Sequence, residues 1–286
     1  MKRLTLTLAL AMLAGTWASA ESSVWRVQKG TSTVYIAGTC HILRQADYPL
    51  PDEFDMAYKA SDTIVFETDI AALSDPATAR KMIAKMSYTD GSSIDTHLSP
   101  KAYALLSAYC ASNGVPLAAF KKLKPAMLMP LLSLAALSKL GASQEGVDVY
   151  YHRKATSDNK VVGELETVDE QIGYVATMAD GNEDAFVIQS LNDMATLKKE
   201  FDSLLAAWRK GDGDKIDHLM LKDMKKQMPQ LYKRLLTDRN SNWLPRIEAL
   251  YKTPGTEFVL VGVAHLVGPD GLLEAMRKKG YKVEKL

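Results

Sequence analysis

The chain has 286 residues, 47% of them apolar, and its 35 Lys and Arg nearly balance 34 Asp and Glu. This is the composition of an ordinary globular protein, long enough for one large α/β domain or two small ones. The formal net charge of +1 gives no indication of nucleic acid or of an anionic membrane as a partner.

Residues 1–20 have the pattern of a secretory signal peptide. The charged pair Lys2-Arg3 precedes a short apolar run, and Ala18-Ser19-Ala20 supplies a small-x-small pattern with cleavage after Ala20. The run is too short to span a membrane. Cleavage removes two positive charges and takes the balance from +1 to about −1. The sequence therefore predicts a periplasmic or secreted protein whose mature chain is residues 21–286.

Two features of the mature chain bear on its core. Cys40 and Cys110 are few for an exported protein, so disulfides are not expected to be the scaffold. Cys40 is more simply explained as a small buried residue behind His41, with pairing to Cys110 left open. The apolar segment Pro125–Leu140, ended by Gly141, is expected to be a core helix. A role in membrane association is less favoured, because charged residues bound a run too short to span.

Strand patterns alternate with helical patterns along the rest of the chain. No linker separates two domains, so we expect one α/β domain with a central mixed β-sheet flanked by helices, and with helical insertions. The expected strands are Val24–Gln28 and Thr33–Ile36 as a hairpin, Asp62–Asp69, Lys160–Thr167, Glu257–Val261 and Tyr281–Val283. One helix is expected to begin at Asp52, and several are expected within 71–125. The others are Pro125–Leu140, Gly146–Ala155, long helices over 171–240, a short helix that runs to about Tyr251, and Gly271–Lys279.

The most informative feature is a strand motif that occurs twice. Gly38-Thr39-Cys40-His41 and Gly262-Val263-Ala264-His265 each follow a β-branched or aromatic run of strand length. Glycine at a strand end lets the backbone turn sharply or another group approach closely. The histidine is then presented at the carboxyl end of the strand, where open α/β sheets bind ligands. The repetition favours a functional role over two structural boundary histidines.

Two further predicted strands end in carboxylates. Glu67 follows the strand that ends at Phe66, and Glu166 closes the next strand along the chain. Two imidazoles, from His41 and His265, with one or two carboxylates suit Zn²⁺, Mn²⁺, Co²⁺ or Fe²⁺ and leave open positions for water. Such a metal lowers the pKa of its water and polarises a carbonyl, so hydrolysis is the expected reaction class.

The remaining polar residues have candidate roles beside this set. The carboxylate that does not bind metal, with Glu166 the candidate, can serve as general base, and Arg239 with Asn240 can hold an oxyanion or a substrate carboxylate. The alternative is that Glu67 and Glu166 are structural partners of Arg239. Arg239 can also cap a helix or pair with Asp238.

Taken in order, these motifs resemble the TraB/PrgY/GumN family, which includes the TIKI proteins. The resemblance runs from about Val24 to the C-terminus and implies the α/β fold shared with erythromycin esterase and the haem-binding ChaN proteins. It rests on Gly38–His41, Tyr48–Pro51, Phe66-Glu67, Leu165–Thr167 with Glu170-Gln171, Arg239-Asn240 with Trp243, and Gly262–His265.

The TIKI branch consists of metal-dependent proteases that trim the amino terminus of Wnt proteins with two Gly-x-x-His motifs, a glutamate, and Mn²⁺ or Co²⁺. The resemblance therefore implies ligand roles for His41, His265 and Glu67. It makes an exported metal-dependent hydrolase acting on a peptide or protein substrate the first hypothesis. The second is a non-catalytic protein that captures peptide or haem in the same cleft.

Overall fold

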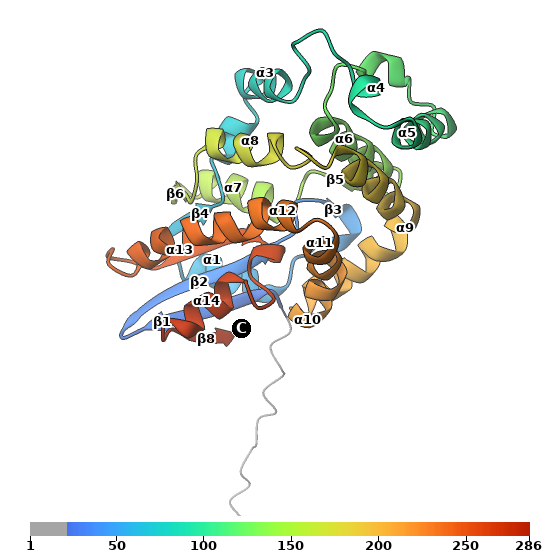
Figure 1. Ribbon diagram of the computed structural model, residues 1–286. Helices are drawn as coiled ribbons and strands as arrows, with labels where there is room; N and C mark the ends of the chain where they lie inside the picture. Colours follow the sequence, from blue (N-terminus) through green and yellow to red (C-terminus); the bar gives the residue numbers. More distant parts are fainter. Residues whose placement is uncertain (1–21) are drawn as a thin grey trace, which may run out of the picture.

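Six strands form one mixed β-sheet at the centre of the computed structural model, which describes residues 22–286 (Figure 1). They are β1 (Val24–Lys29), β2 (Ser32–Thr39), β4 (Thr63–Phe66), β6 (Val161–Glu164), β7 (Glu257–Gly262) and β8 (Lys282–Lys285). Their order across the sheet is β6-β4-β7-β2-β1-β8. The first four are mutually parallel, whereas β1 pairs antiparallel with both β2 and β8. The signal peptide expected over residues 1–20 lies outside the described residues.

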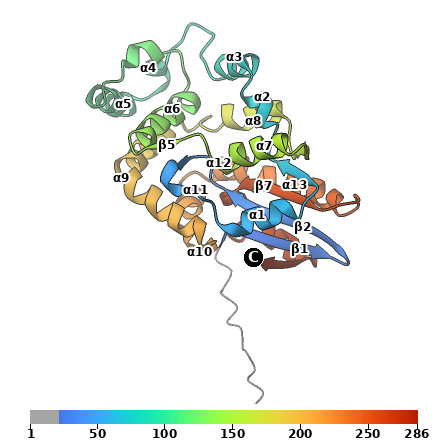
Figure 2. The same ribbon diagram turned by 180° about the vertical axis from the view of Figure 1, so that it is seen from behind.

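Helices cover both faces of the sheet and extend beyond it. α1 (Asp52–Lys59) and α7 (Val147–Ser157) lie on one face, and α13 (Asp238–Leu250) and α14 (Leu272–Lys278) lie on the other (Figures 1 and 2). The other helices gather beside the sheet, mainly above it in Figure 1. They are α2 (Ile70–Leu73), α3 (Pro76–Lys85), α4 (Ile94–His97), α5 (Pro100–Ser112), α6 (Pro125–Ser138), α8 (Val168–Ala176), α9 (Glu183–Arg209), α10 (Gly213–Ile216), α11 (Lys222–Gln227) and α12 (Pro229–Tyr232). The predicted single α/β domain, with a mixed sheet and helical insertions, is confirmed.

The two Gly-x-x-His strands are neighbours in the sheet. β2 and β7 pair in parallel, with Gly38 opposite Val261 and Thr39 opposite Gly262. Gly38 is required for this packing, because a methyl group on it would lie 2.6 Å from Val263 Cγ2 and 3.0 Å from the Cα of the same residue. The pairing places both motifs at the same edge of the sheet.

Two hydrophobic clusters fill the molecule. One lies against the sheet and includes Ile36, Phe258, Trp208 and Trp243, each fully buried. The other lies among the helices beside the sheet and includes Leu132 of α6. The prediction of a core helix over Pro125–Leu140 is therefore confirmed, although the helix ends at Ser138. Among residues 22–286, no helix is long and apolar enough to cross a membrane.

The structure differs from the sequence-based expectations in three local respects. The region expected as long helices is broken after α9, where Gly211 has a φ of +56° and Pro229 begins a new helix. A two-stranded pair, β3 (Leu43–Arg44) with β5 (Ala142–Ser143), was not expected, because two-residue strands carry no periodic signal. Cys40 and Cys110 are free thiols, so the disulfide left open is absent.

Candidate functional site

The carboxyl ends of the four parallel strands meet at one edge of the sheet. This edge brings together all the site residues proposed from the sequence, because parallel strands end on the same side. They are His41 after β2, Glu67 after β4, Glu166 after β6, His265 after β7, and Arg239 and Asn240 in the first turn of α13.

Gly262, the last residue of β7, lies at the centre of this cluster. A methyl group built on its Cα would lie 3.2 Å from Glu67 Oε1, 3.4 Å from His41 Nε2 and 3.7 Å from His265 Cδ2. These three side chains therefore surround one small space above the Gly262 backbone. Glycine keeps the space open, because the Cβ of any other residue would enter it.

His41 forms the open side of the cluster, with 59% of its side chain exposed. Its Nδ1 lies 2.7 Å from Asp148 Oδ2, and Asp148 also accepts a hydrogen bond from Thr39 Oγ1 at 2.9 Å. The Asp148 carboxylate raises the pKa of His41 to about 9. Since Nδ1 is engaged with Asp148, Nε2 is the nitrogen left facing the space over Gly262.

Asp148 is a site residue that the sequence did not reveal. It lies 107 positions from His41, in a segment whose pattern indicated only an amphipathic helix. The start of α7 reaches the His41 loop because a glycine precedes it: a methyl group on Gly146 would lie 2.3 Å from the Cys40 carbonyl oxygen. The Val147 amide donates to the same oxygen at 3.0 Å. A glycine before a helix with an acidic first turn was the available signal.

His265 is buried and held in one tautomer. Asn240 donates from Nδ2 to the backbone oxygens of His265, at 3.2 Å, and of Asp270, at 3.1 Å. Its Oδ1 lies 2.8 Å from His265 Nδ1, so that nitrogen carries the hydrogen and Nε2 presents a lone pair. Burial lowers the pKa of His265 to about 3, and the nearby positive charges of Arg239 and His41 act in the same direction. The imidazole is therefore neutral at physiological pH.

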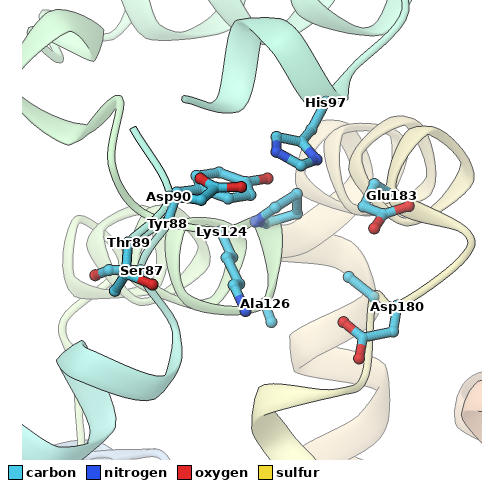
Figure 3. Close-up of a pocket in the computed structure, with 11 residues that line it drawn as sticks. Ser87, Tyr88, Thr89, Asp90, His97, Lys124, Ala126, Asp180 and Glu183 are labelled. Carbon is cyan, nitrogen blue, oxygen red and sulfur yellow. The ribbon is translucent and has the colours of Figure 1, made fainter. Parts of the chain in front are cut away.

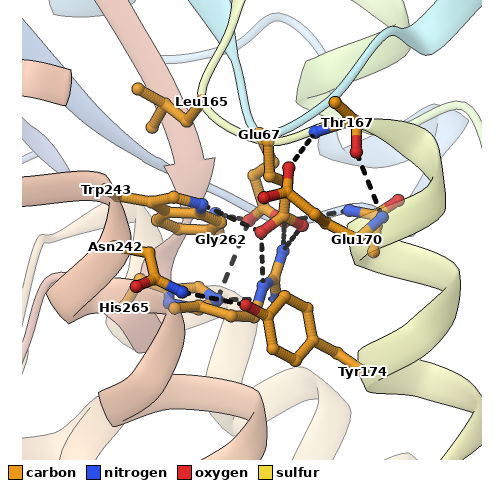
Figure 4. A network of polar contacts seen from close by, with 12 residues as sticks. Glu67, Leu165, Thr167, Glu170, Tyr174, Asn242, Trp243, Gly262 and His265 are labelled. Carbon is orange, nitrogen blue, oxygen red and sulfur yellow. Dashed lines mark hydrogen bonds and ion pairs between the residues drawn. The ribbon is translucent and has the colours of Figure 1, made fainter.

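Arg239 is the most extensively bonded side chain of the cluster, in which Glu67, Trp243 and His265 lie close together (Figure 4). It donates to Glu166 from Nε at 3.1 Å and from Nη2 at 2.7 Å, and to Glu67 Oε2 from Nη2 at 2.6 Å. Its Nη1 lies 3.1 Å from His265 Nε2. The guanidinium also lies over the Trp243 ring, 4.5 Å from the centroid. Both carboxylates are thus partners of Arg239, as the structural alternative held.

The two carboxylates differ in their electrostatic surroundings. Burial works to raise the pKa of Glu67, but Arg239, His41 and the Gly262 amide outweigh it and hold the pKa at about 2. The pKa of Glu166 is raised, because burial outweighs the bonds from Arg239 and Trp243. Glu67 is therefore a stable anion, and Glu166 is the carboxylate more easily protonated.

The donor types fit a divalent metal, but Arg239 is placed among them. Two imidazole nitrogens and a carboxylate oxygen are a common ligand set for transition metals. His265 Nε2 and Glu67 Oε1 lie 4.0 Å apart, and the guanidinium is bonded to both residues. Across residues 22–286, no group of three or more His, Cys, Asp or Glu side chains is arranged so that it could hold a metal ion without rearrangement.

A separate pocket lies among the helices beside the sheet and contains none of these residues. Tyr88 and His97 stack there with ring centroids 4.2 Å apart, and Asp90, Asp180 and Glu183 line the same pocket (Figure 3). Burial and the carboxylates raise the pKa of Tyr88 to about 12.

Fold and site together define an α/β protein in which paired Gly-x-x-His strands carry two histidines to a carboxylate–arginine cluster. The chain belongs to the TraB/PrgY/gumN family, whose family model matches residues 23–285. This match confirms the family that the motifs resemble. Neither a curated protein nor a solved structure matches the chain, so the expected likeness to erythromycin esterase and ChaN stays a prediction.

Proposed function

We propose that the protein is a metal-dependent hydrolase acting on peptides or proteins, with His41, Glu67 and His265 as ligands of a divalent cation. The main support is the convergence of these three side chains on the space over Gly262. Mn²⁺ or Co²⁺ is the cation that the family resemblance implies. Zn²⁺ and Fe²⁺ accept the same nitrogen and oxygen ligands.

The second support is how the two imidazoles are oriented. Asp148 binds Nδ1 of His41, and Asn240 binds Nδ1 of His265, so each ring keeps Nε2 for the site. Metal-binding histidines commonly have such an oxygen partner on the other ring nitrogen. We assign Asp148 and Asn240 to this positioning role.

The remaining residues suit acid–base and electrostatic work. A bound cation would supply a water of lowered pKa and would polarise a substrate carbonyl. Glu166 is the proposed general base, because burial raises its pKa and so makes it the better proton acceptor of the two carboxylates. Arg239 is the proposed group that stabilises a developing oxyanion.

We also propose that the protein is exported, on the strength of residues 1–20. Its substrate would then be met in the periplasm or outside the cell. A peptide or protein substrate follows from the family resemblance, and the balanced charge of the chain argues against nucleic acid.

Metal analysis of the purified mature protein, together with a cleavage screen on mixed peptides with and without Mn²⁺, tests this function. We expect bound metal and Mn²⁺-stimulated cleavage, both lost in His41→Ala and His265→Ala. His218→Ala is the matched control, because His218 is an exposed histidine far along the chain from either motif. A mature protein that binds no divalent metal, or two variants with unchanged metal content, would overturn the proposal.

The extent of the Arg239 contacts favours a second candidate, a protein that captures peptide or haem without turnover. In the structure the guanidinium already bonds to His265 Nε2 and to Glu67, so two of the three proposed ligands have a cationic partner. This candidate predicts stoichiometric retention of ligand and no product in a mass-spectrometric peptide screen. Steady Mn²⁺-stimulated cleavage would eliminate it.

A further inference from the structure

Arg239, a cation, already contacts two of the three proposed metal ligands. His265 Nε2, a proposed ligand atom, faces Arg239 Nη1 at 3.1 Å. In Glu67 it is Oε2 that accepts from Nη2, at 2.6 Å, whereas Oε1, the oxygen nearest the space over Gly262, accepts from the Gly262 amide at 2.7 Å. The lone pair of a neutral imidazole cannot bind an N–H donor and a metal ion at the same time. Arg239 Nη1 must therefore withdraw from His265 before this histidine can act as a ligand.

We propose, taking the metal site above as given, that Arg239 is a resident cation that a metal ion displaces, and that it sets how tightly the metal binds. The side chains of Glu67 and Glu166 are only 7% and 3% exposed. Buried carboxylates without a counter-charge are strongly destabilising. Arg239 supplies that charge, so the folded site needs no metal to be stable.

The contacts of Arg239 allow it to leave the ligands without leaving the site. Its contact with His265 comes from Nη1, whereas Nε and Nη2 hold Glu166 through two bonds, and Nη2 also donates to Glu67. Arg239 also stacks on Trp243, whose indole N–H donates to Glu166 Oε2 at 2.9 Å. Nη1 can therefore leave His265 while Nε keeps its bond to Glu166, and the freed Nη1 can turn toward a substrate.

Repulsion between the positive charges of Arg239 and a metal ion makes their binding to the site mutually exclusive. A guanidinium and a divalent cation repel each other strongly at short range in a buried site, so both cannot occupy the same contacts. A protein that keeps Arg239 on its ligands binds metal more weakly than one with a neutral residue at that position. Replacement of Arg239 by a neutral side chain of similar polarity should raise metal affinity.

Isothermal titration of Mn²⁺ and Zn²⁺ into the full mature protein tests this in wild type, Arg239→Gln and Arg239→Lys. We expect Arg239→Gln to lower the Kd at least about tenfold, and Arg239→Lys, which keeps the charge, to stay within about threefold of wild type. Arg246→Gln is the matched control: it removes the same charge from the same helix, but Arg246 contacts Glu170 and the Leu165 carbonyl. Its affinity for metal should equal that of wild type.

A measurement on the unaltered protein guards against misfolding of the variants. In ¹⁵N NMR spectra we expect saturating Zn²⁺ to shift the Arg239 Nη signals while Nε–H, bonded to Glu166, changes little. Two results would overturn the displacement while leaving the metal site intact. One is that the Nη signals do not change at saturating Zn²⁺, and the other is that a folded Arg239→Gln protein binds metal no more tightly than wild type. If wild type and all variants bind no metal, the proposed function and this inference both fail.

Discussion

Replacing Gly262 with alanine places one methyl group in the space that His41, Glu67 and His265 share. The backbone at Gly262, with φ −50° and ψ 133°, is open to any residue. Contacts of 3.2 Å with Glu67 and 3.4 Å with His41 are tight, and such crowding costs about 1–3 kcal/mol. The lost freedom of glycine in the unfolded chain offsets about 0.4–1 kcal/mol of this. We expect the free energy of unfolding in urea to fall by less than about 3 kcal/mol.

Metal affinity should respond far more than stability. Donor atoms lie about 2.0–2.2 Å from a bound cation, so a methyl group and a cation cannot both contact Glu67 and His41. We expect the Kd for Mn²⁺, measured by calorimetry, to rise more than about 100-fold, the upper end of the losses caused by removing a ligand's supporting group. The control is Gly163→Ala in β6, where the methyl meets only Val65 Cγ2 at 3.7 Å. Unchanged Mn²⁺ affinity in Gly262→Ala would refute this placement of the site.

Three further outcomes follow from the structure. Gly38→Ala should lower the free energy of unfolding in urea by about 1–3 kcal/mol, since its methyl would overlap Val263, backbone included; a neutral effect would contradict the close strand packing. Asp148→Asn should bring the pKa of His41 down from about 9 toward its ordinary value, as seen by NMR titration, and an unmoved pKa would remove Asp148 from its positioning role. His265 resists protonation to about pH 3, whereas the unfolded chain takes up that proton near pH 6.5, so stability should fall with falling pH across this window by up to about 1.4 kcal/mol per unit. His265→Gln should show a shallower dependence, and an equal slope would count against the buried neutral imidazole.

One geometric rule predicted that the candidate residues would meet at one edge of the sheet. Glu67, Glu166 and the two Gly-x-x-His histidines each follow a strand, and the carboxyl ends of parallel strands share an edge. Local patterns also predicted where most strands and helices lie, because period and capping are short-range properties. The capping box of Thr167 and Glu170 is an example, with the Thr167 amide donating to Glu170 Oε2 at 2.7 Å.

What the sequence could not predict depends on contacts between distant segments. The glycine before α7 does not by itself show that the Asp148 carboxylate meets His41, because that contact exists only once α7 packs on the loop after β2. The sequence left open whether Arg239 pairs with a carboxylate or with substrate, and in the structure it pairs with both Glu67 and Glu166. Partner choice among several charged groups is decided by tertiary packing, which a local pattern does not contain.

The place of β7 governs how the chain reaches its folded state. β7 lies between β4 and β2, although all but one of the other strands of the sheet precede it along the chain. Its pairing with β2 joins opposite ends of the polypeptide, and such distant pairings form slowly because loop closure costs entropy before any contact compensates. During synthesis the position between β4 and β2 stays empty until Glu257–Gly262 has emerged from the ribosome, and His265 follows three residues later. A growing chain therefore cannot bring His41 and His265 together early, because the late segment that carries β7 completes both the middle of the sheet and the cluster.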